Sequence, residues 1–384
     1  MTGKQRVELA IDHIEADRIP RYDSFWLQTE RSFLKGGLDK KVKACEKIEI
    51  DGLSRTIGDP LRDYFDFDFD VLYIDTSLRM PCKTLEEHGE YTVLKDRYGF
   101  TVKKFKDKTG SMHFIDHVTK NMEDWDRLKH RMVFNTSGAS RIDSESYFMH
   151  HAPYPTWGGF KKIYDKYRER QKYMLYACYG VWEGTWRHHG FEETMMDAAL
   201  RPDKVAEMFE YHTNMVLDTV AHAIKIGAKP DGIWLIEDLG GTHTTLISEN
   251  MYVDLVMSFH KKIADFCHAN DMKLFMHSCG LIESFIQHFI DAGLDVLQAI
   301  QANTGMNVRN LKDKYGDRLT FFGNIGVTKL AGTKEDIYEE VSSKIPYAKV
   351  GGGYIYHSDH SISDDISLKN YEYLMSLVEN FGSY

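Results

Sequence analysis

The chain has few cysteines and no long hydrophobic run, and each shortage excludes a class of protein. Its five cysteines among 384 residues are odd in number, widely spaced and without a Cys-x-x-Cys pair. Such cysteines do not make a disulfide framework, so we expect a reducing compartment. No apolar stretch reaches the roughly 18 residues that a membrane-spanning helix needs. The first residues lack the pattern of a signal peptide, and we expect a cytoplasmic protein without a membrane partner.

A surplus of basic residues is also missing. The net charge of −10 argues against a nucleic-acid-binding protein, because phosphate binding requires a basic surface. No Gly-x-Gly-x-x-Gly follows a strand-like run, which argues against a dinucleotide-binding sheet. There is no Gly-x-Ser-x-Gly signature either, so the sequence indicates no nucleophilic serine. Aromatic residues at 13% and charged residues at 28% are typical of a globular protein.

The pattern that is present is an alternation of apolar runs with amphipathic, helix-like stretches. The strand-like runs are Arg21–Trp26, Asp70–Asp75, Tyr173–Tyr179, Gly232–Ile236, Lys273–His277, Asp295–Ile300, Leu319–Gly323 and Gly353–Tyr356. Alternating β and α units imply a parallel sheet with right-handed crossovers. Their number and the chain length favour an α/β protein of the (β/α)8 TIM-barrel type. A doubly wound open sheet is the alternative.

One segment breaks this alternation. Residues Glu90–Phe105 alternate apolar and polar side chains around an Asp-Arg-Tyr-Gly turn, a pattern typical of a β-hairpin. We therefore expect a single barrel domain over residues 1–384, with a β-hairpin region inserted at about residues 80–118.

The most informative motif is His277-Ser-Cys279-Gly280, which ends a short apolar run. Side chains two positions apart in a strand point to the same face, so His277 and Cys279 can hold one ion together. Imidazole and thiolate suit zinc, and an incomplete set of protein ligands leaves a position for substrate. The alternative is a buried strand end with a hydrogen-bonded histidine and an inert cysteine.

Polar residues follow several other expected strands, and strand ends form the active site of a (β/α)8 barrel. Glu237 and Asp238 are adjacent, so one can face the metal while the other orients a neighbour or transfers a proton. His360 is a candidate further ligand, although the run His357-Ser-Asp359-His360 offers three. Near other expected strand ends lie four candidate substrate-binding residues, Trp26, Tyr179, Trp182 and Asn324. For each of these residues, a turn, a helix cap or core packing is the competing interpretation.

These motifs resemble the uroporphyrinogen decarboxylase superfamily, and within it the zinc-dependent, corrinoid-linked methyltransferases. The resemblance covers most of the chain and is best at about residues 231–373. It rests on His277-x-Cys279-Gly280, on Gly293-Leu-Asp295-Val-Leu, on Phe322-Gly323-Asn324-Ile-Gly326 and on the stretch from Gly352 to Ile362. The family fold that it implies is again a (β/α)8 barrel.

Two departures from the family pattern narrow the implied activity. The decarboxylases carry an N-terminal arginine cluster that neutralises a polycarboxylated tetrapyrrole, whereas residues 18–31 here hold scattered arginines among aromatic and neutral side chains. The coenzyme M methyltransferases have a cysteine near the position of His360, where this chain has His360 or Asp359. With one thiolate fewer, zinc is a stronger Lewis acid, which suits an ether oxygen better than a thiol.

The resemblance therefore implies an aromatic O-demethylase component. In such enzymes the methyl group of a methoxylated phenol passes to cob(I)alamin on a separate corrinoid protein. The implied metal ligands are Glu237, His277, Cys279 and His360, with Asp238 and His360 as catalytic residues. The implied cofactors are Zn²⁺ and the partner's cobalamin. A methylcobalamin:thiol methyltransferase is the first alternative. A uroporphyrinogen decarboxylase follows, and then a non-enzymatic tetrapyrrole- or corrinoid-binding protein without a metal. The oligomeric state stays open, with a homodimer as one option.

Overall fold

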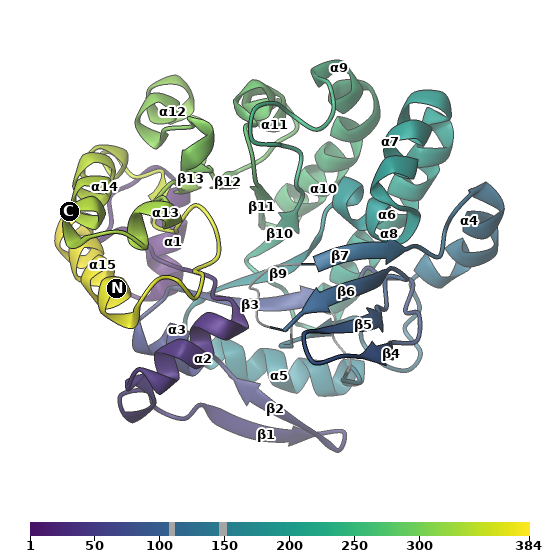
Figure 1. Ribbon diagram of the computed structural model, residues 1–384, viewed down its shortest axis with the longest axis horizontal. Coiled ribbons are helices and arrows are strands. Elements are labelled where there is room, and N and C mark those ends of the chain that lie inside the picture. Colours follow the sequence, from purple (N-terminus) through teal and green to yellow (C-terminus); the bar gives the residue numbers. More distant parts are fainter. Residues whose placement is uncertain (107–111, 146–151) are drawn as a thin grey trace.

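The computed structural model describes residues 1–106, 112–145 and 152–384. Its centre is an eight-stranded sheet in the order β14-β13-β12-β11-β10-β9-β3-β8, with helices around it (Figure 1). The strands are β3 (Phe69–Ile74), β8 (Ile142–Asp143), β9 (Tyr173–Tyr179), β10 (Gly232–Ile236), β11 (Lys273–Ser278), β12 (Val296–Ala299), β13 (Thr320–Gly323) and β14 (Tyr354–Ile355). All neighbours in this sheet are parallel except β3 and β8.

Long helices connect the parallel strands and cover the outer face of the sheet (Figure 1). The helices are α1 (Gly3–Ile11), α2 (Leu27–Lys35), α3 (Pro60–Tyr64), α4 (Met122–Leu128), α5 (Trp157–Glu169), α6 (Val181–His189), α7 (Phe191–Leu200), α8 (Pro202–Lys225), α9 (Glu249–Met251), α10 (Met257–Ala269), α11 (Ile286–Asp291), α12 (Val308–Tyr315), α13 (Val327–Leu330), α14 (Lys334–Ala348) and α15 (Leu368–Gly382). Because both faces are covered, β9 is buried along its whole length, as parallel strands usually are.

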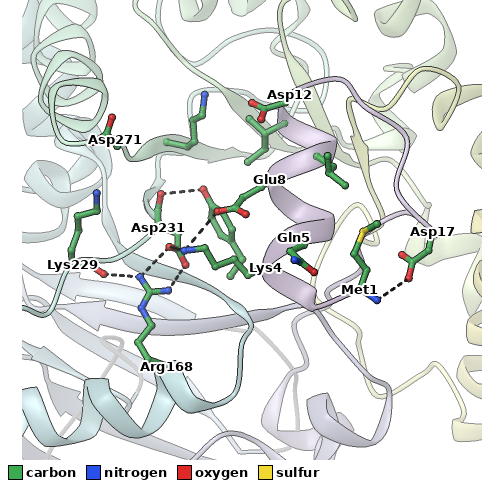
Figure 2. A pocket seen from close by; sticks show the side chains of 14 residues that line it. Met1, Lys4, Gln5, Glu8, Asp12, Asp17, Arg168, Lys229, Asp231 and Asp271 are labelled. Atoms are coloured by element: carbon green, nitrogen blue, oxygen red, sulfur yellow. Dashed lines mark hydrogen bonds and ion pairs between the residues drawn. The ribbon is translucent and has the colours of Figure 1, made fainter.

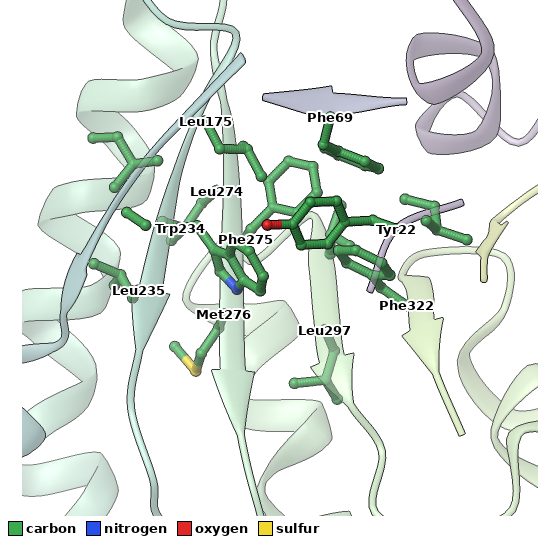
Figure 3. Packing of buried hydrophobic residues seen from close by; sticks show 14 of the residues in the cluster. Tyr22, Phe69, Leu175, Trp234, Leu235, Leu274, Phe275, Met276, Leu297 and Phe322 are labelled. Atoms are coloured by element: carbon green, nitrogen blue, oxygen red, sulfur yellow. The ribbon is translucent and has the colours of Figure 1, made fainter. Parts of the chain in front are cut away.

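The inner face of the sheet is filled with aromatic rings (Figure 3). Phe69 of β3 stacks on Phe322 of β13 with ring centroids 5.3 Å apart, and Trp234 of β10 lies 5.9 Å from the same ring. The ring of Tyr22 packs against Phe69, Trp234 and Phe322, with ring centroids 5.7–6.5 Å apart. Strands that are far apart in the sheet order thus meet through their side chains, so the sheet is strongly curled.

The predicted α/β fold is confirmed, whereas closure of the sheet into a barrel is not. In the described residues the sheet has β14 at one edge and β8 at the other. The expected first strand, Arg21–Trp26, contains only isolated bridges, from Arg21 to Tyr356 and from Phe25 to Ile362. On its other side, the backbone N–H of Asp68 donates to the carbonyl of Arg21 at 2.9 Å.

In the described part of the chain, two smaller sheets lie outside the central one. The first is the hairpin of β1 (Glu46–Ile50) and β2 (Leu53–Ile57). The second is an antiparallel sheet of β4 (Lys83–Glu87), β5 (Tyr91–Lys95), β6 (Thr101–Phe105) and β7 (Met112–Asp116). It occupies the region where the sequence predicts an insertion, and residues 107–111 of that region lie outside the described part. The division into one domain with an insertion stays a prediction.

None of the helices in the described residues is both long and apolar enough to cross a membrane.

Candidate metal centre

Three potential metal ligands meet where β10 and β11 end. Asp238 follows β10, His277 is the second-last residue of β11, and Cys279 follows that strand. The Sγ of Cys279 is 3.2 Å from Nε2 of His277, and that nitrogen is 3.4 Å from Oδ1 of Asp238. One ligand atom from each residue lies within 4.8 Å of the other two. The His277 side chain is 17% exposed and that of Asp238 is 40% exposed, so the cluster can be reached from outside.

Two glycines allow the loops to approach so closely. Gly280 has a φ of +86°, and a Cβ there would lie 2.2 Å from the carbonyl carbon of Gly240. A side chain at Gly240 would in turn lie 2.6 Å from the carbonyl oxygen of Cys279. The contact brings the Cys279 N–H to Oδ1 of Asp238 at 2.8 Å, and it therefore holds both ligands in one place.

The charges within the cluster support one another. Desolvation opposes the charged form of His277, but Cys279 and Asp238 outweigh it and raise the pKa of the imidazole well above its usual range. Desolvation likewise raises the pKa of the Asp238 carboxyl, but the hydrogen bond and charge of His277 reverse this and lower it to about 2. Burial raises the pKa of the Cys279 thiol, with His277 acting against it. A divalent cation would replace the proton of His277 as the positive charge.

The residues present fit a zinc ion. Imidazole, thiolate and carboxylate are all zinc ligands, and three protein ligands leave one position of a tetrahedral site open. Nδ1 of His277 faces Oε1 of Gln298, which leaves Nε2 as the nitrogen directed at Cys279 and Asp238. A hydrogen-bond partner behind a histidine ligand is a common feature of metal sites.

Helix α6 places a buried ion pair beside the cluster. The Glu183 carboxylate accepts hydrogen bonds from Arg187 at 2.5 Å and from the indole of Trp186 at 3.0 Å. Burial raises the pKa of Glu183 to about 7, with Arg187 acting against it and the charge of Asp238 adding to it. The Arg187 guanidinium lies 3.9 Å from the ring centroid of Tyr179. The loop after β9 thus brings charged and aromatic side chains to the end of the sheet that holds the cluster.

Comparison with known proteins identifies the family. The family model described as "Uroporphyrinogen decarboxylase (URO-D)" matches residues 177–381, which is more than half of the chain and includes the whole cluster. The chain belongs to the uroporphyrinogen decarboxylase family. The superfamily resemblance seen in the sequence motifs is thereby confirmed.

Individual relatives of this family are distant. A uroporphyrinogen decarboxylase of Pseudoalteromonas translucida (strain TAC 125) is 23% identical over 192 residues, which are 48% of this chain and 51% of the relative. One from Vesicomyosocius okutanii subsp. Calyptogena okutanii (strain HA) is 24% identical over 174 residues, 44% of this chain and 47% of the relative. The chain spans about half the length of the curated relatives it matches.

A solved structure, a methyltransferase from Methanosarcina mazei, is similar over the whole chain. The TM-score is 0.62, and the match covers 99% of each chain at 14% sequence identity. At this identity the likeness concerns the fold. The likeness in fold also includes the residues before 177.

The structure turns Glu237 away from the cluster. Its carboxylate is fully buried and accepts hydrogen bonds from the backbone N–H groups of Trp182 and Glu183, both at 2.9 Å. Nε2 of His260 lies 2.9 Å from the same carboxylate. The expectation that Glu237 binds the metal is therefore contradicted by its contacts. Its carboxylate caps the N-terminus of α6 instead, where a negative charge stabilises the helix.

His360 is also outside the group of ligand atoms that lie together in the described residues. Its ring stacks on Trp26 with centroids 6.2 Å apart. Asp359, the other candidate in that run, accepts backbone hydrogen bonds from Ala302 at 2.9 Å and Val327 at 2.8 Å. Asp238 takes the place in the cluster that the sequence assigned to Glu237 and His360.

The candidate substrate-binding residues divide into two groups. Trp182 is fully buried and packs toward Phe209, and Asn324 uses its amide to hold the backbone of Ile300 and Met306 at 2.8 and 2.9 Å. Both have structural roles, contrary to expectation. Trp26 is partly exposed beside His360 and stays a candidate. Tyr179 is buried beneath Arg187, next to the cluster.

A separate cavity lies at the other end of the sheet. It has a volume of about 940 Å³ and lies between α1 and the first residues of β9, β10 and β11 (Figure 2). Its charged side chains pair with each other: Asp231 accepts from Lys4 at 2.7 Å and from Arg168 at 2.6 Å. Because Asp231 precedes β10 whereas Asp238 follows it, this cavity is separate from the candidate metal centre.

Three side chains that support the site could not be identified from the sequence. They are Gln298, which lies behind His277, and the Glu183–Arg187 pair of α6. Their four-residue spacing on an amphipathic helix is typical of a surface ion pair, and burial of both was not visible in the sequence.

Proposed function

We propose that this protein is a zinc-dependent methyltransferase that moves a methyl group from an aromatic methyl ether to cob(I)alamin on a partner corrinoid protein. The observation that carries the proposal is the cluster of Asp238, His277 and Cys279 at the carboxyl ends of β10 and β11. The likeness in fold to a methyltransferase over the whole chain supports it. The proposed ligand set replaces Glu237 and His360 with Asp238.

The donor set fits an ether substrate. A zinc ion on one thiolate, one imidazole and one carboxylate would supply Lewis acidity at its open position, where an ether oxygen can bind. In the proposed reaction the methyl–oxygen bond would break, the methyl group would go to the cobalt nucleophile of the partner, and the aryl oxygen would leave as a phenolate that takes up a proton. No nucleophilic side chain is required, because the corrinoid supplies the attacking electron pair.

The chain's own residues would orient the substrate and manage the proton. The stacked rings of Trp26 and His360 offer a flat surface for an arene. Glu183, whose pKa is about 7, is suited to supply a proton to the leaving phenolate oxygen. We keep His360 as a candidate substrate contact and Asp238 as a ligand that also accepts the Cys279 N–H.

A thiol methyltransferase is less well supported. In the described residues the other four cysteines, Cys45, Cys82, Cys178 and Cys267, are outside the cluster. A single thiolate ligand leaves the zinc ion more electrophilic than two would, which favours activation of an ether over activation of a thiol.

Decarboxylation of a polycarboxylated tetrapyrrole is also less well supported, although the curated relatives carry that name. Arg18 pairs with Asp68 at 2.7 Å and with Asp66 at 2.9 Å, and Arg21 pairs with Asp66 at 2.9 Å. These pairs lie where β3 begins, at the opposite end of the sheet from the cluster. Both arginines are thus occupied and remote from the site.

We further propose that the curled sheet closes into a (β/α)8 barrel. Residues 20–22 would form the strand that joins β14 to β3. The bridge from Arg21 to Tyr356 and the bond from Asp68 to Arg21 support this. The mouth of such a barrel would receive the corrinoid partner at the cluster.

The decisive experiment mixes the protein with cob(I)alamin and a panel of methoxybenzenes and follows methylcobalamin by absorbance. We expect conversion with at least one methoxyarene, loss of conversion after zinc removal, and recovery after zinc is returned. Cys279→Ala is the inactive control. Cys82→Ala changes a partly buried cysteine outside the cluster and is the matched substitution. Methylation of a thiol from methylcobalamin, with no conversion of any methoxyarene, would favour the first alternative.

A further inference from the structure

A chain of three buried side chains supports the imidazole of His277 from behind. Nδ1 of His277 faces Oε1 of Gln298, and Nε2 of Gln298 lies 3.3 and 3.4 Å from the two ring nitrogens of His357. Nδ1 of His357 lies 3.5 Å from Oδ1 of Asp23. Gln298, His357 and Asp23 are 2%, 1% and 0% exposed, so water does not compete for these contacts.

Asp23 determines which nitrogen of His357 carries hydrogen. Its carboxylate accepts hydrogen bonds from the hydroxyls of Tyr356 and Tyr371, both at 2.7 Å, and from the N–H of Ser358 at 2.8 Å. Nδ1 of His357 therefore faces two acceptors, the Asp23 carboxylate and the carbonyl oxygen of Ser358. Two acceptors require a donor between them, so the hydrogen is on Nδ1. Burial lowers the pKa of His357, and the neutral ring keeps Nε2 as an acceptor.

The acceptor nitrogen of His357 then orients the amide of Gln298. An amide NH₂ donates and an amide oxygen accepts, so the NH₂ group turns to His357 and the oxygen turns to His277. Facing an oxygen, Nδ1 of His277 must carry hydrogen. Nε2 is then the nitrogen whose lone pair a metal ion would take, in place of the proton, beside Cys279 and Asp238. With the reverse amide orientation, His357 would need hydrogen on Nε2 and would set a bare Nδ1 against the Asp23 carboxylate.

We propose that Asp23, His357 and Gln298 are positioning residues that hold His277 in the tautomer whose Nε2 binds the metal ion. They act through one another and touch neither substrate nor metal. The metal-binding role rests on the proposed function, whereas the tautomer of His357 does not. Loss of such support behind a histidine ligand typically lowers metal affinity by about 10- to 100-fold.

The first test measures zinc affinity by competition with a chromophoric chelator, which needs no methyl transfer. We expect Gln298→Leu to bind zinc about 10- to 100-fold more weakly than the wild type. Gln298→Glu keeps an acceptor toward His277 and should bind at least as tightly as the wild type. Equal affinity of the Leu variant and the wild type would overturn the proposal.

The second test determines the tautomer of His357 by ¹⁵N NMR of histidine-labelled, metal-free protein, with His357→Gln to assign the signal. We expect hydrogen on Nδ1 in the wild type, and hydrogen on Nε2 in the wild type would overturn the proposal. Tyr371→Phe is the matched control, because it removes a different hydrogen bond to Asp23 and should leave both the tautomer and the zinc affinity unchanged. Asp23→Asn should weaken zinc binding as Gln298→Leu does. If Asp23→Asn does not fold, the tautomer of His357 in the wild type and the zinc affinities of Gln298→Leu and Gln298→Glu still test the proposal.

The two tests separate this inference from the proposed function. A wild-type protein with the expected tautomer and the expected zinc affinities but no methyl transfer would contradict the proposed function alone. A protein that transfers methyl groups while Gln298→Leu binds zinc normally would contradict the positioning role alone.

Discussion

At the scale of single residues, the candidate site depends on three side chains whose spacing was partly visible in the sequence. His277 and Cys279 were predictable because alternate residues of a strand share a face. The choice between Glu237 and Asp238 was not, because adjacent residues point to opposite faces and nothing local says which face is inside. The contact of Glu237 with the N-terminus of α6 decides it.

The zinc content of purified variants tests this assignment. We expect His277→Ala, Cys279→Ala and Asp238→Ala each to lower zinc affinity by more than tenfold, since each removes a ligand of a site with three protein ligands. His360→Ala should retain zinc and change only methoxyarene turnover. Atomic absorption after dialysis gives the result. Full zinc in Asp238→Ala together with loss of zinc in His360→Ala would restore the ligand set expected from the sequence.

The buried Glu183 carboxyl predicts a dependence of stability on pH. Burial raises its pKa from the ordinary 4.5 to about 7, so the folded state holds a proton that the unfolded state has released. The contribution of this proton to the stability of the folded state is complete below pH 4.5 and is lost as the pH rises through about 7. Between these two pH values, the unfolding free energy of the wild type should therefore fall by up to about 3 kcal/mol relative to that of Glu183→Gln. Urea unfolding of both proteins at several pH values measures the difference.

A matched substitution separates this effect from general charge effects. Glu49→Gln alters an exposed carboxylate of β1 and should give a stability profile parallel to that of the wild type. Parallel profiles for Glu183→Gln and the wild type would mean that the pKa of Glu183 is not raised.

At the scale of elements, the apolar runs located the strands well. The expected bounds of the strands now labelled β9 and β10 are those of the structure, and β11 is one residue longer than expected. Long buried runs between helices leave little choice of structure. Arg21–Trp26 was wrongly expected to be a regular strand. Contacts of Arg21 with Asp66 hold this segment instead, and such contacts come from distant parts of the chain.

The close approach of the two loops behind the cluster predicts the effect of a Cβ. Gly280→Ala would place a methyl group against Gly240 at a positive φ, so the loops must separate. We expect a loss of about 2–4 kcal/mol of unfolding free energy and weaker zinc binding. Gly305→Ala is the control: its φ is +92° but no atom lies within 4 Å of the added Cβ. It should cost about 1 kcal/mol and leave zinc binding unchanged.

At the scale of the whole molecule, the arginines of the N-terminal segment tie that segment to the residues just before β3. Arg18 is 9% exposed and Asp68 is 2% exposed, so removing the guanidinium leaves a buried carboxylate with fewer partners. Arg18→Met should lower the unfolding free energy by about 3 kcal/mol and leave the KM for the methoxyarene unchanged. Arg31→Ala, at an exposed position, should cost less than about 0.5 kcal/mol. Denaturant unfolding and steady-state kinetics of both variants provide the measurements. A large rise in KM with unchanged stability in Arg18→Met would place this arginine in a substrate site.

Sequence distance explains what could not be foreseen at this scale. The fold class follows from a periodic pattern that each segment carries by itself. The support of His277 does not, because Asp23 and Ser358 are 335 positions apart and no local pattern links them.

The same separation has a consequence for the order in which the protein matures. During synthesis, Asp238, His277 and Cys279 leave the ribosome before His357 exists, so the nascent chain has all three proposed ligands without the partner that orients the imidazole. If the proposed positioning role holds, a high-affinity site would arise only after the last strand has joined the N-terminal segment. Metal loading would then follow folding, and a chain truncated before β14 would keep its proposed ligands but bind zinc poorly.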